Sequence, residues 1–272
     1  MIQIIFNNSI FYTPKFLTFS GGEEHVNIEY QEQKEDLPII INSQITSSTE
    51  LMRLLLTTDS LRRLYDNDIE LFIPYIPYAR QDRACQLGDS FSLEVFANII
   101  SSQKYSKVTV VDPHSPVSHE LFKNINVITQ ERMIDGVNSR LRDIDYIVSP
   151  DMGASRKAKD WMYRWNYLGN QSELILATKK RNELGEIIAT EVNCGDITGS
   201  KCLIVDDICD GGRTFTELAK VLRDKGSKEV YLYVTHGIFA KVLPLEGIDK
   251  VFTTDSLPEK DDGRIIVKRF FN

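Results

Sequence analysis

Several features that would place this chain in a familiar class are missing from its sequence. No apolar stretch reaches the roughly 20 residues that cross a membrane, and the first residues lack the basic start and long apolar run of a signal peptide. The four cysteines form no CxxC pair, so the sequence indicates neither a zinc site nor a disulfide framework, and we expect free thiols. We therefore expect a cytoplasmic protein that makes no contact with membranes.

Two further absences concern the partners of the chain. Basic residues are not in excess, because 39 acidic residues outnumber 32 lysines and arginines, and the formal charge of −7 argues against nucleic acid as the main partner. There is also no GxxxxGKS or GxxxxGKT sequence, so a P-loop does not hold any nucleotide that binds here. The remaining composition is ordinary, since 42% hydrophobic residues over 272 positions suffice for two domains with buried cores.

The order of β-prone and helical segments predicts an α/β fold with mainly parallel sheets. Apolar residues recur at helical spacing in three segments, at 47–65, 90–100 and 214–225. Short β-prone runs lie before, between and after them, at 1–12, 70–73, 107–111, 146–148, 174–177, 202–205 and 230–234.

The two halves of the chain repeat one pattern. VTVVDPHS, from Val108, and CLIVDDIC, from Cys202, each place an apolar strand directly before an aspartate. This correspondence suggests a degenerate tandem duplication in which each half kept different chemical residues. We expect a first domain at 1–132 and a second at 133–272, with no low-complexity linker between them.

The segment KCLIVDDICDGGRTFTELAK, at 201–220, predicts a binding site for a sugar phosphate. A buried strand leads to paired carboxylates that suit ribose hydroxyls or a divalent cation, and glycines then precede a helix N-terminus that favours a phosphate. The alternative is an ordinary turn in which one aspartate caps the helix and the paired carboxylates are merely solvated. The candidate residues are Asp206, Asp207, Asp210, Gly211, Gly212, Arg213 and Thr214.

Polar residues follow other strands as well. PYIPYARQDR, at 74–83, puts Arg80 and Gln81 where a guanidinium grips a polyphosphate bidentately and an amide hydrogen-bonds another group, although a salt-bridged loop explains the segment equally well. His114 and Asp151 follow strands in the first and second half, and both are groups that ligate a cation. Mg²⁺ needs only one or two carboxylates beside phosphate oxygens and waters.

A basic run, TKKR at 178–181, follows the apolar strand 174–177 and precedes a polar segment, NELGEI, that has the composition of a mobile loop. Runs of this kind are usually solvated. Cations that close over a bound polyphosphate can, however, stabilise the negative charge that develops when a phosphoryl group is transferred. The run is therefore a candidate for the catalytic machinery.

These segments together resemble the ribose-phosphate diphosphokinases, also called PRPP synthetases, from Phe19 to Gly237 and in the order of that family. The resemblance implies two tandem type I phosphoribosyltransferase-like domains, each with a mainly parallel sheet flanked by helices. It implies that the diphosphoryl group of ATP is transferred, with Mg²⁺, to the C1 hydroxyl of a 5-phosphorylated ribose, that AMP is released and that the protein is a homo-oligomer.

The resemblance also implies roles for single residues. TKKR matches a Lys-Arg-Arg run of the family, and FSGGE is similar to its FxDGE segment, which contacts adenine. The residues implied are Lys179 and Arg181 as catalytic; Phe19, Glu23, Arg80, Gln81 and His114 as ATP-binding; His114 and Asp151 as Mg²⁺ ligands; and Asp206, Asp207 and 210–214 as binding the ribose phosphate.

The chain departs from the family at two places that bear on specificity. Gly21 replaces the aspartate of FxDGE, which removes one hydrogen-bond acceptor for the base. The family's loop D-T-G/A-G-T reads DGGRT at 210–214, so a hydroxyl is lost and the guanidinium of Arg213 is gained. Two acceptors therefore stay open, ribose 5-phosphate as the default and ADP-ribose, whose diphosphorylated product would serve NAD salvage.

A third alternative is a regulator that keeps the fold and binds similar ligands without catalysis. Retention of Lys179, Arg181, His114 and Asp151 argues against it.

We predict that inorganic phosphate activates this protein only weakly. The segment ACQLGDSF, at 84–91, is poorer in basic residues than the corresponding segment that binds regulatory phosphate in many bacterial PRPP synthetases, and the sequence ends at FFN without their longer C-terminal region. AMP release measured over a series of phosphate concentrations checks this, and a strong rise in rate contradicts it.

Overall fold

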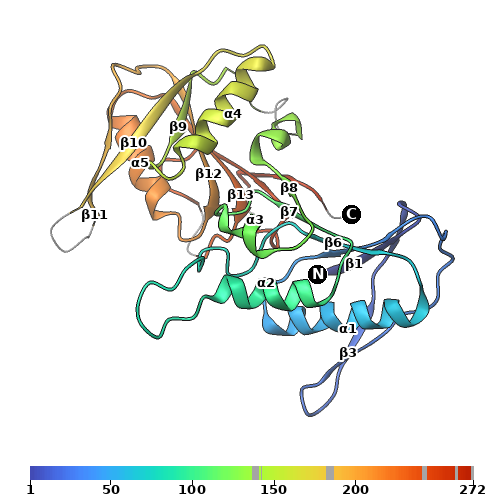
Figure 1. The fold of residues 1–272 in the computed structure, drawn as a ribbon. Coiled ribbons are helices and arrows are strands. Elements are labelled where there is room, and N and C mark those ends of the chain that lie inside the picture. Colours follow the sequence, from blue (N-terminus) through green and yellow to red (C-terminus); the bar gives the residue numbers. More distant parts are fainter. Residues whose placement is uncertain (137–140, 142, 182–186, 241–243, 261–262, 271–272) are drawn as a thin grey trace. The chain divides into compact units, whose positions relative to one another are not determined.

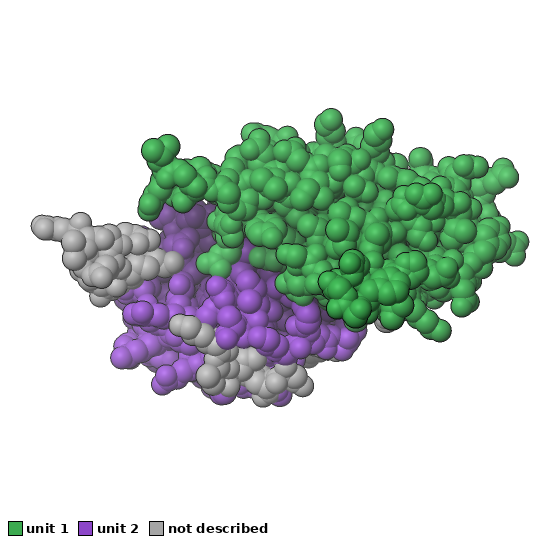
Figure 2. Space-filling view, turned by 90° about the horizontal axis from the view of Figure 1, so that it is seen from below, with its two compact units in different colours: residues 1–128, 271 green, residues 129–270, 272 purple. Residues whose placement is uncertain are grey.

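The computed structural model describes residues 1–272 except 137–140, 142, 182–186, 241–243, 261–262 and 271–272, and its side-chain description also omits 135–136, 179–181 and 187–189. The chain divides into unit 1, residues 1–128, and unit 2, residues 129–270 (Figure 2). Each unit has its own sheet and its own buried clusters, so each is described by itself.

Unit 1 is built on a six-stranded sheet in the order β2-β1-β5-β6-β7-β8 (Figure 1). Strands β5 to β8 are parallel, β1 is antiparallel to both of its neighbours, and β3 and β4 form a separate hairpin. The elements are β1 (Ile2–Phe6), β2 (Ile10–Tyr12), β3 (Lys15–Thr18), β4 (Glu24–Asn27), β5 (Ile39–Ser43), α1 (Ser48–Leu64), β6 (Ile69–Ile73), α2 (Ser92–Ser102), β7 (Lys107–Val111), α3 (Val117–Leu121) and β8 (Ile125–Ile128).

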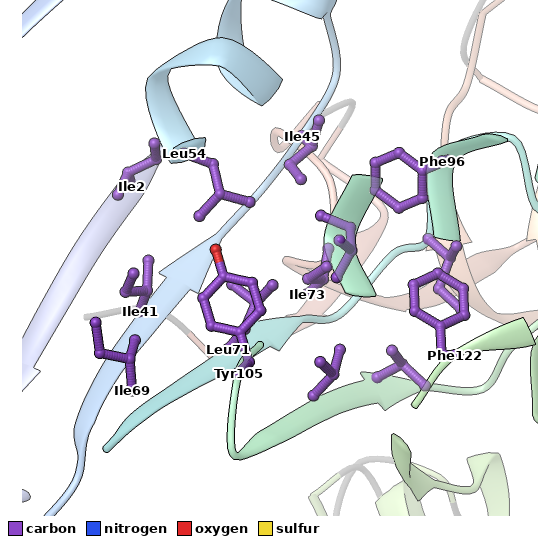
Figure 3. Close-up of a cluster of buried hydrophobic side chains, with 14 of the residues drawn as sticks. Ile2, Ile41, Ile45, Leu54, Ile69, Leu71, Ile73, Phe96, Tyr105 and Phe122 are labelled. Carbon is purple, nitrogen blue, oxygen red and sulfur yellow. The ribbon is translucent and has the colours of Figure 1, made fainter. Parts of the chain in front are cut away.

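The core of unit 1 follows from the apolar spacing in its helices. Helix α1 begins where the hydroxyl of Ser47 accepts a hydrogen bond from the Glu50 amide, and it buries Leu54 on the same face as the other inward residues of the helix. Figure 3 shows Leu54 and Phe96 of the helices in one cluster with isoleucines of the sheet and with Leu71. The buried hydroxyl of Tyr105 lies 2.6 Å from the Thr58 hydroxyl, and burial raises the pKa of Tyr105 to about 12.

Unit 2 is built on a seven-stranded sheet in the order β11-β10-β9-β12-β13-β14-β15. Its strands are parallel apart from β11, which pairs antiparallel with β10. The elements are the 3₁₀ helix η1 (Gln130–Gly136), β9 (Tyr146–Ser149), α4 (Ser155–Tyr167), β10 (Glu173–Arg181), β11 (Ile187–Val192), β12 (Lys201–Cys209), α5 (Arg213–Asp224), β13 (Glu229–Gly237), β14 (Lys250–Thr254) and β15 (Ile265–Lys268).

Strand β12 contributes to the core of unit 2 on both faces of the sheet, because apolar side chains project from each of its faces. Leu203 and Val205 point to one face and belong to the cluster that holds the buried side of α4, whereas Cys202 and Ile204 point to the other face and belong to the cluster that holds the buried side of α5. Helices therefore cover the central parallel strands on both sides, and the predicted α/β class with mainly parallel sheets is confirmed.

Strands β10, β12 and β13 extend further than the sequence predicts, and β13 continues from Val234, its expected end, to Gly237. Strand β12 was expected to end at Val205, but it continues to Cys209 because β13 offers a parallel partner along its whole length, with Asp206 opposite Val234. Strand β10 was expected to end at Ala177, but it continues to Arg181 because the antiparallel β11 pairs with its last residues. In β10 and in β12, pairing with a neighbouring strand stabilises extended backbone although the local residues are polar.

Within the described residues, none of the helices is both long enough and apolar enough to cross a bilayer.

Replacement of Trp161 by Ala should strongly destabilise unit 2. Trp161 is fully buried, stacks on Trp165 with ring centroids 5.4 Å apart and lies 5.8 Å from the Tyr233 ring. Loss of such a side chain leaves a cavity and lowers the free energy of unfolding by about 3–5 kcal/mol. Denaturant unfolding followed by tryptophan fluorescence measures this, since both tryptophans of the chain lie in α4.

Tyr163 provides the matched control on the same helix, because 56% of it is exposed. Tyr163→Ala should change the free energy of unfolding by no more than about 0.5 kcal/mol. Equal losses in the two variants would contradict the assigned packing of α4.

Candidate functional site

Two adjacent carboxylates lie near the carboxyl end of β12. Asp207 is buried and Asp206 is half-buried, and a carboxylate oxygen of Asp206, Oδ1, accepts a hydrogen bond of 2.9 Å from the Asp207 amide. Burial raises the pKa of Asp206 well above its usual range, and the negative charges of Asp207 and Asp151 raise it further. The structure thus brings three carboxylates of unit 2 near enough to repel one another, and a bound cation or hydroxyl donors would relieve that repulsion.

Two residues that the sequence analysis did not single out contact this pair. The ammonium group of Lys157, in the first turn of α4, lies 3.4 Å from Oδ2 of Asp207. The side-chain amide of Gln130 donates to the backbone carbonyl of Asp206 over 2.6 Å and to the hydroxyl of Thr235 over 3.0 Å. Lys157 and Gln130 are 50 and 76 residues away from their partners, so only the fold reveals them.

A loop and the N-terminus of α5 follow the carboxylates. Gly212 precedes the helix at φ +75°, and its carbonyl accepts hydrogen bonds from the amides of Phe215 and Thr216. The amides of Arg213 and Thr214 come before these bonds and have no carbonyl four residues earlier within the helix. With the positive end of the helix dipole, they form a site that favours an anion such as a phosphate.

The loop is tied to the segment that follows β13. The amide of Ala240 donates to the carbonyl of Asp210 over 3.0 Å, and the amides of Ile238 and Phe239 donate to the carbonyl of Cys209. A Cβ atom on Gly212 would overlap a methyl carbon of the Leu245 side chain, which would have to shift, and the positive φ of this residue also favours glycine.

The guanidinium of Arg213 is directed along the exposed side of α5. Its Nε lies 2.6 Å from Oε1 of Glu217, one helical turn later, and the Arg213 side chain is 84% exposed. In this arrangement the guanidinium, which the family's loop lacks, pairs with Glu217.

Asp151 lies in the turn between β9 and α4. Its Oδ1 accepts a hydrogen bond of 3.1 Å from the amide of Ala154, which directly precedes the helix. In the part of the chain that the structure describes, no three or more histidine, cysteine, aspartate or glutamate side chains are grouped as a metal site. The structure therefore neither supports nor contradicts the prediction that Asp151 holds a cation.

In unit 1, the RQDR segment and His114 line one cavity of about 390 Å³. Arg83 holds the carboxylate of Asp82 at 3.0 Å, and this bond, with a weaker contribution from the Ser115 hydroxyl, lowers the pKa of Asp82. The structure therefore groups two of the predicted ATP ligands with the predicted histidine. The lining residues are Arg80, Gln81, Asp82, Arg83, Cys85, Asp89, Ser90 and His114.

Phe19 and Glu23 lie at the turn of the β3–β4 hairpin and are exposed. They are not among the residues that line the cavity with His114. Arg53 of α1 fixes the hairpin, since its Nε lies 2.6 Å from Glu24 and its guanidinium lies over the Phe16 ring. The carboxylate of Glu24 thus forms an ion pair that holds the hairpin against α1, whereas Glu23 is exposed to solvent.

Lys179 and Arg181 are placed through their backbone alone. They lie in the last paired residues of β10, opposite β11. Lys179 is opposite Thr190, and the register shifts between Lys180 and Arg181. Their side chains, and residues 182–186 after them, lie outside the described residues.

Comparison with known protein families gives two matches. Residues 11–103 match the N-terminal domain of ribose phosphate pyrophosphokinase, and residues 117–266 match the phosphoribosyl transferase domain. The second match alone spans more than half of the chain.

Individual proteins agree with these matches. A ribose-phosphate pyrophosphokinase of Aquifex aeolicus is 33% identical over 261 residues, which cover 92% of this chain and 81% of the relative. One from Hyphomonas neptunium is 30% identical over 88% of this chain and 78% of its own length. The phosphoribosylpyrophosphate synthetase of Mycobacterium smegmatis shares the fold, with a TM-score of 0.78 and 24% identity over 94% of this chain and 86% of that one.

Replacement of Gly212 by Ala should destabilise unit 2 through the loop before α5. A non-glycine residue at this positive φ costs about 1–2 kcal/mol, and the contact of a Cβ with Leu245 adds about 1–3 kcal/mol for overpacking. Denaturant unfolding followed by tryptophan fluorescence measures the loss.

Gly263 is the matched control, because its φ of +79° is nearly the same and a Cβ there meets open space. Gly263→Ala should show only the cost of the backbone conformation. If G212A loses no more stability than G263A, the contact with Leu245 does not constrain the loop.

Proposed function

This chain belongs to the ribose-phosphate pyrophosphokinase family, and we propose that it transfers the diphosphoryl group of ATP to the C1 hydroxyl of a 5-phosphorylated ribose. The C1 oxygen forms a bond to the β-phosphorus of ATP, the bond between that phosphorus and the oxygen bridging to the α-phosphate breaks, and AMP leaves. The observation that carries the proposal is the order of groups at the carboxyl end of β12, where two carboxylates in the strand are followed by a glycine loop and a helix N-terminus.

The two ends of a ribose phosphate fit the two parts of this segment. Asp206 and Asp207 accept hydrogen bonds from ribose hydroxyls, which are neutral donors and therefore tolerate the nearby negative charge. The loop at 210–214 surrounds the 5-phosphate, with the amides of Arg213 and Thr214 and the Thr214 hydroxyl as hydrogen-bond donors. This binding fixes the orientation of the C1 hydroxyl, so less entropy is lost when the transition state forms.

The proposed ATP contacts come from unit 1. Arg80 grips the polyphosphate, and Gln81 and His114 bind beside it in the same cavity. Phe19 offers a ring face to the base, and Glu23 offers a carboxylate acceptor to its exocyclic amine.

The proposed catalytic cations are Lys179 and Arg181 at the end of β10. They stabilise the negative charge that develops on the diphosphoryl group and on the departing AMP. Mg²⁺, when bound, neutralises phosphate oxygens, and Asp151 and His114 are the residues proposed to hold it. The mutual repulsion of Asp151, Asp206 and Asp207 supports a cation near this end of unit 2.

One observation favours ADP-ribose as a second candidate acceptor. Gly211 and Arg213 make the loop less bulky on one side and more basic on the other, and the Arg213 guanidinium is exposed at the first residue of α5. Rotation away from Glu217 would let it pair with a further phosphate attached to the first one.

We predict that the protein, supplied with Mg²⁺ and ATP, releases AMP in the presence of ribose 5-phosphate. The rate with ribose 5-phosphate should exceed the rate with ADP-ribose. In its described position the Arg213 guanidinium pairs with Glu217, so it offers the loop no cation for the second phosphate of ADP-ribose. Chromatography of AMP and of the phosphorylated sugar measures both reactions.

Turnover with ADP-ribose and none with ribose 5-phosphate would replace the default acceptor by the second candidate. Absence of AMP with both acceptors would contradict the proposed diphosphoryl transfer.

A further inference from the structure

The ion pair between Lys157 and Asp207 joins α4 to the proposed ribose site. Nζ of Lys157 lies 3.4 Å from Oδ2 of Asp207, and the two side chains are only 22% and 8% exposed. A cation–carboxylate contact with so little access to water is screened less than a pair on the surface.

The packing of unit 2 determines which carboxylate the lysine reaches. Successive side chains of a strand alternate between its faces, so Asp207 follows Leu203 and Val205 on the face that α4 covers. Ala158, the residue after Lys157, is fully buried in the cluster that contains Leu203 and Val205. The buried contact between helix and strand therefore holds the lysine beside Asp207.

The chemistry of the pair explains why a cation is needed there. Asp206 and Asp207 are adjacent and mostly removed from water, and each carboxylate disfavours the negative charge of the other. An ammonium group fixed against one of them offsets part of that repulsion, and it also restricts the rotation of the carboxylate to which it is bound.

We propose that Lys157 is a positioning residue, which holds the Asp207 carboxylate in the orientation that accepts the ribose hydroxyls. The inference rests on the proposed function, because it assigns the binding of the acceptor to Asp206 and Asp207. Lys157 then acts through Asp207 and affects the affinity for the sugar, whereas the affinity for ATP does not depend on it.

Steady-state kinetics of Lys157→Met and Lys157→Arg test the proposal, with ribose 5-phosphate and ATP varied separately. K157M should raise the KM for ribose 5-phosphate about tenfold or more, the scale of one hydrogen bond to a charged group. The KM for ATP and kcat should stay within about twofold of the unmodified protein. K157R should recover most of the loss, because it restores a cation beside Asp207.

Lys159→Met is the matched control. Lys159 lies two residues later on α4, is exposed, and places its ammonium group 5.6 Å from the centre of the Tyr163 ring. This variant removes the same charge from the same helix and should leave both KM values unchanged.

A double-mutant cycle separates positioning from direct contact with the substrate. In an Asp207→Asn background, K157M should raise the KM for ribose 5-phosphate by less than about twofold, because the group through which it acts is already altered. A further tenfold rise in that background would show that Lys157 contacts the substrate itself and would overturn the proposal. So would an unchanged KM in K157M, or equal rises for ribose 5-phosphate and ATP.

Misfolding does not imitate the expected result, since KM is independent of the fraction of active protein. The activity of the unmodified protein distinguishes failure of the proposed function from failure of the proposed role of Lys157. If that protein releases no AMP with either ribose 5-phosphate or ADP-ribose, the proposed function fails; if it turns over ribose 5-phosphate and K157M behaves like K159M, only the role of Lys157 fails.

Discussion

Two neighbouring carboxylates at the end of a buried strand place the strongest constraint on unit 2. Asp206 and Asp207 lie in β12, between the apolar residues that form the core and the helix that follows. Burial and mutual repulsion both disfavour their charged forms, so the fold must supply groups that compensate. Lys157 supplies a charge to Asp207, and Gln130 satisfies the backbone carbonyl of Asp206. The cost of such a pair is consistent with a site kept for binding rather than for stability.

The architecture makes this compensation possible because β12 is covered on both faces. Residues that point to one side pack with α4 and residues that point to the other pack with α5, and this alternation reaches the carboxylates. Helix α4 thereby brings a lysine to one side, whereas α5 begins a few residues later and contributes amide groups. The ends of parallel strands are common binding sites for this reason, since several elements converge there.

The sequence predicted the parts of this site that are continuous in the chain. An apolar run before adjacent aspartates indicated β12, and the glycines before a helical pattern indicated the start of α5. It did not predict that Asp206 lies within a strand, because pairing with β13 stabilises extended backbone where local preferences disfavour it. It also missed Lys157 and Gln130, since a basic residue early in a helix and a polar residue after a strand resemble solvated positions until the fold brings their partners to them.

In the proposed function, the loop at 210–214 would bind the phosphate through its backbone and would contact the group attached to that phosphate through its side chains. Backbone amides at a helix N-terminus bind any phosphate group, so the loss of the family's threonine at Gly211 leaves that part of the site intact. The side chains around the loop set how much room lies beyond the phosphate, and here Gly211 carries none while Arg213 pairs with Glu217. The departures from the family therefore bear on the size and charge of the proposed acceptor, whereas the proposed binding of its phosphate depends on the backbone. Gly212 has a positive φ and approaches Leu245 closely, so it constrains the backbone on which the proposed phosphate contacts depend.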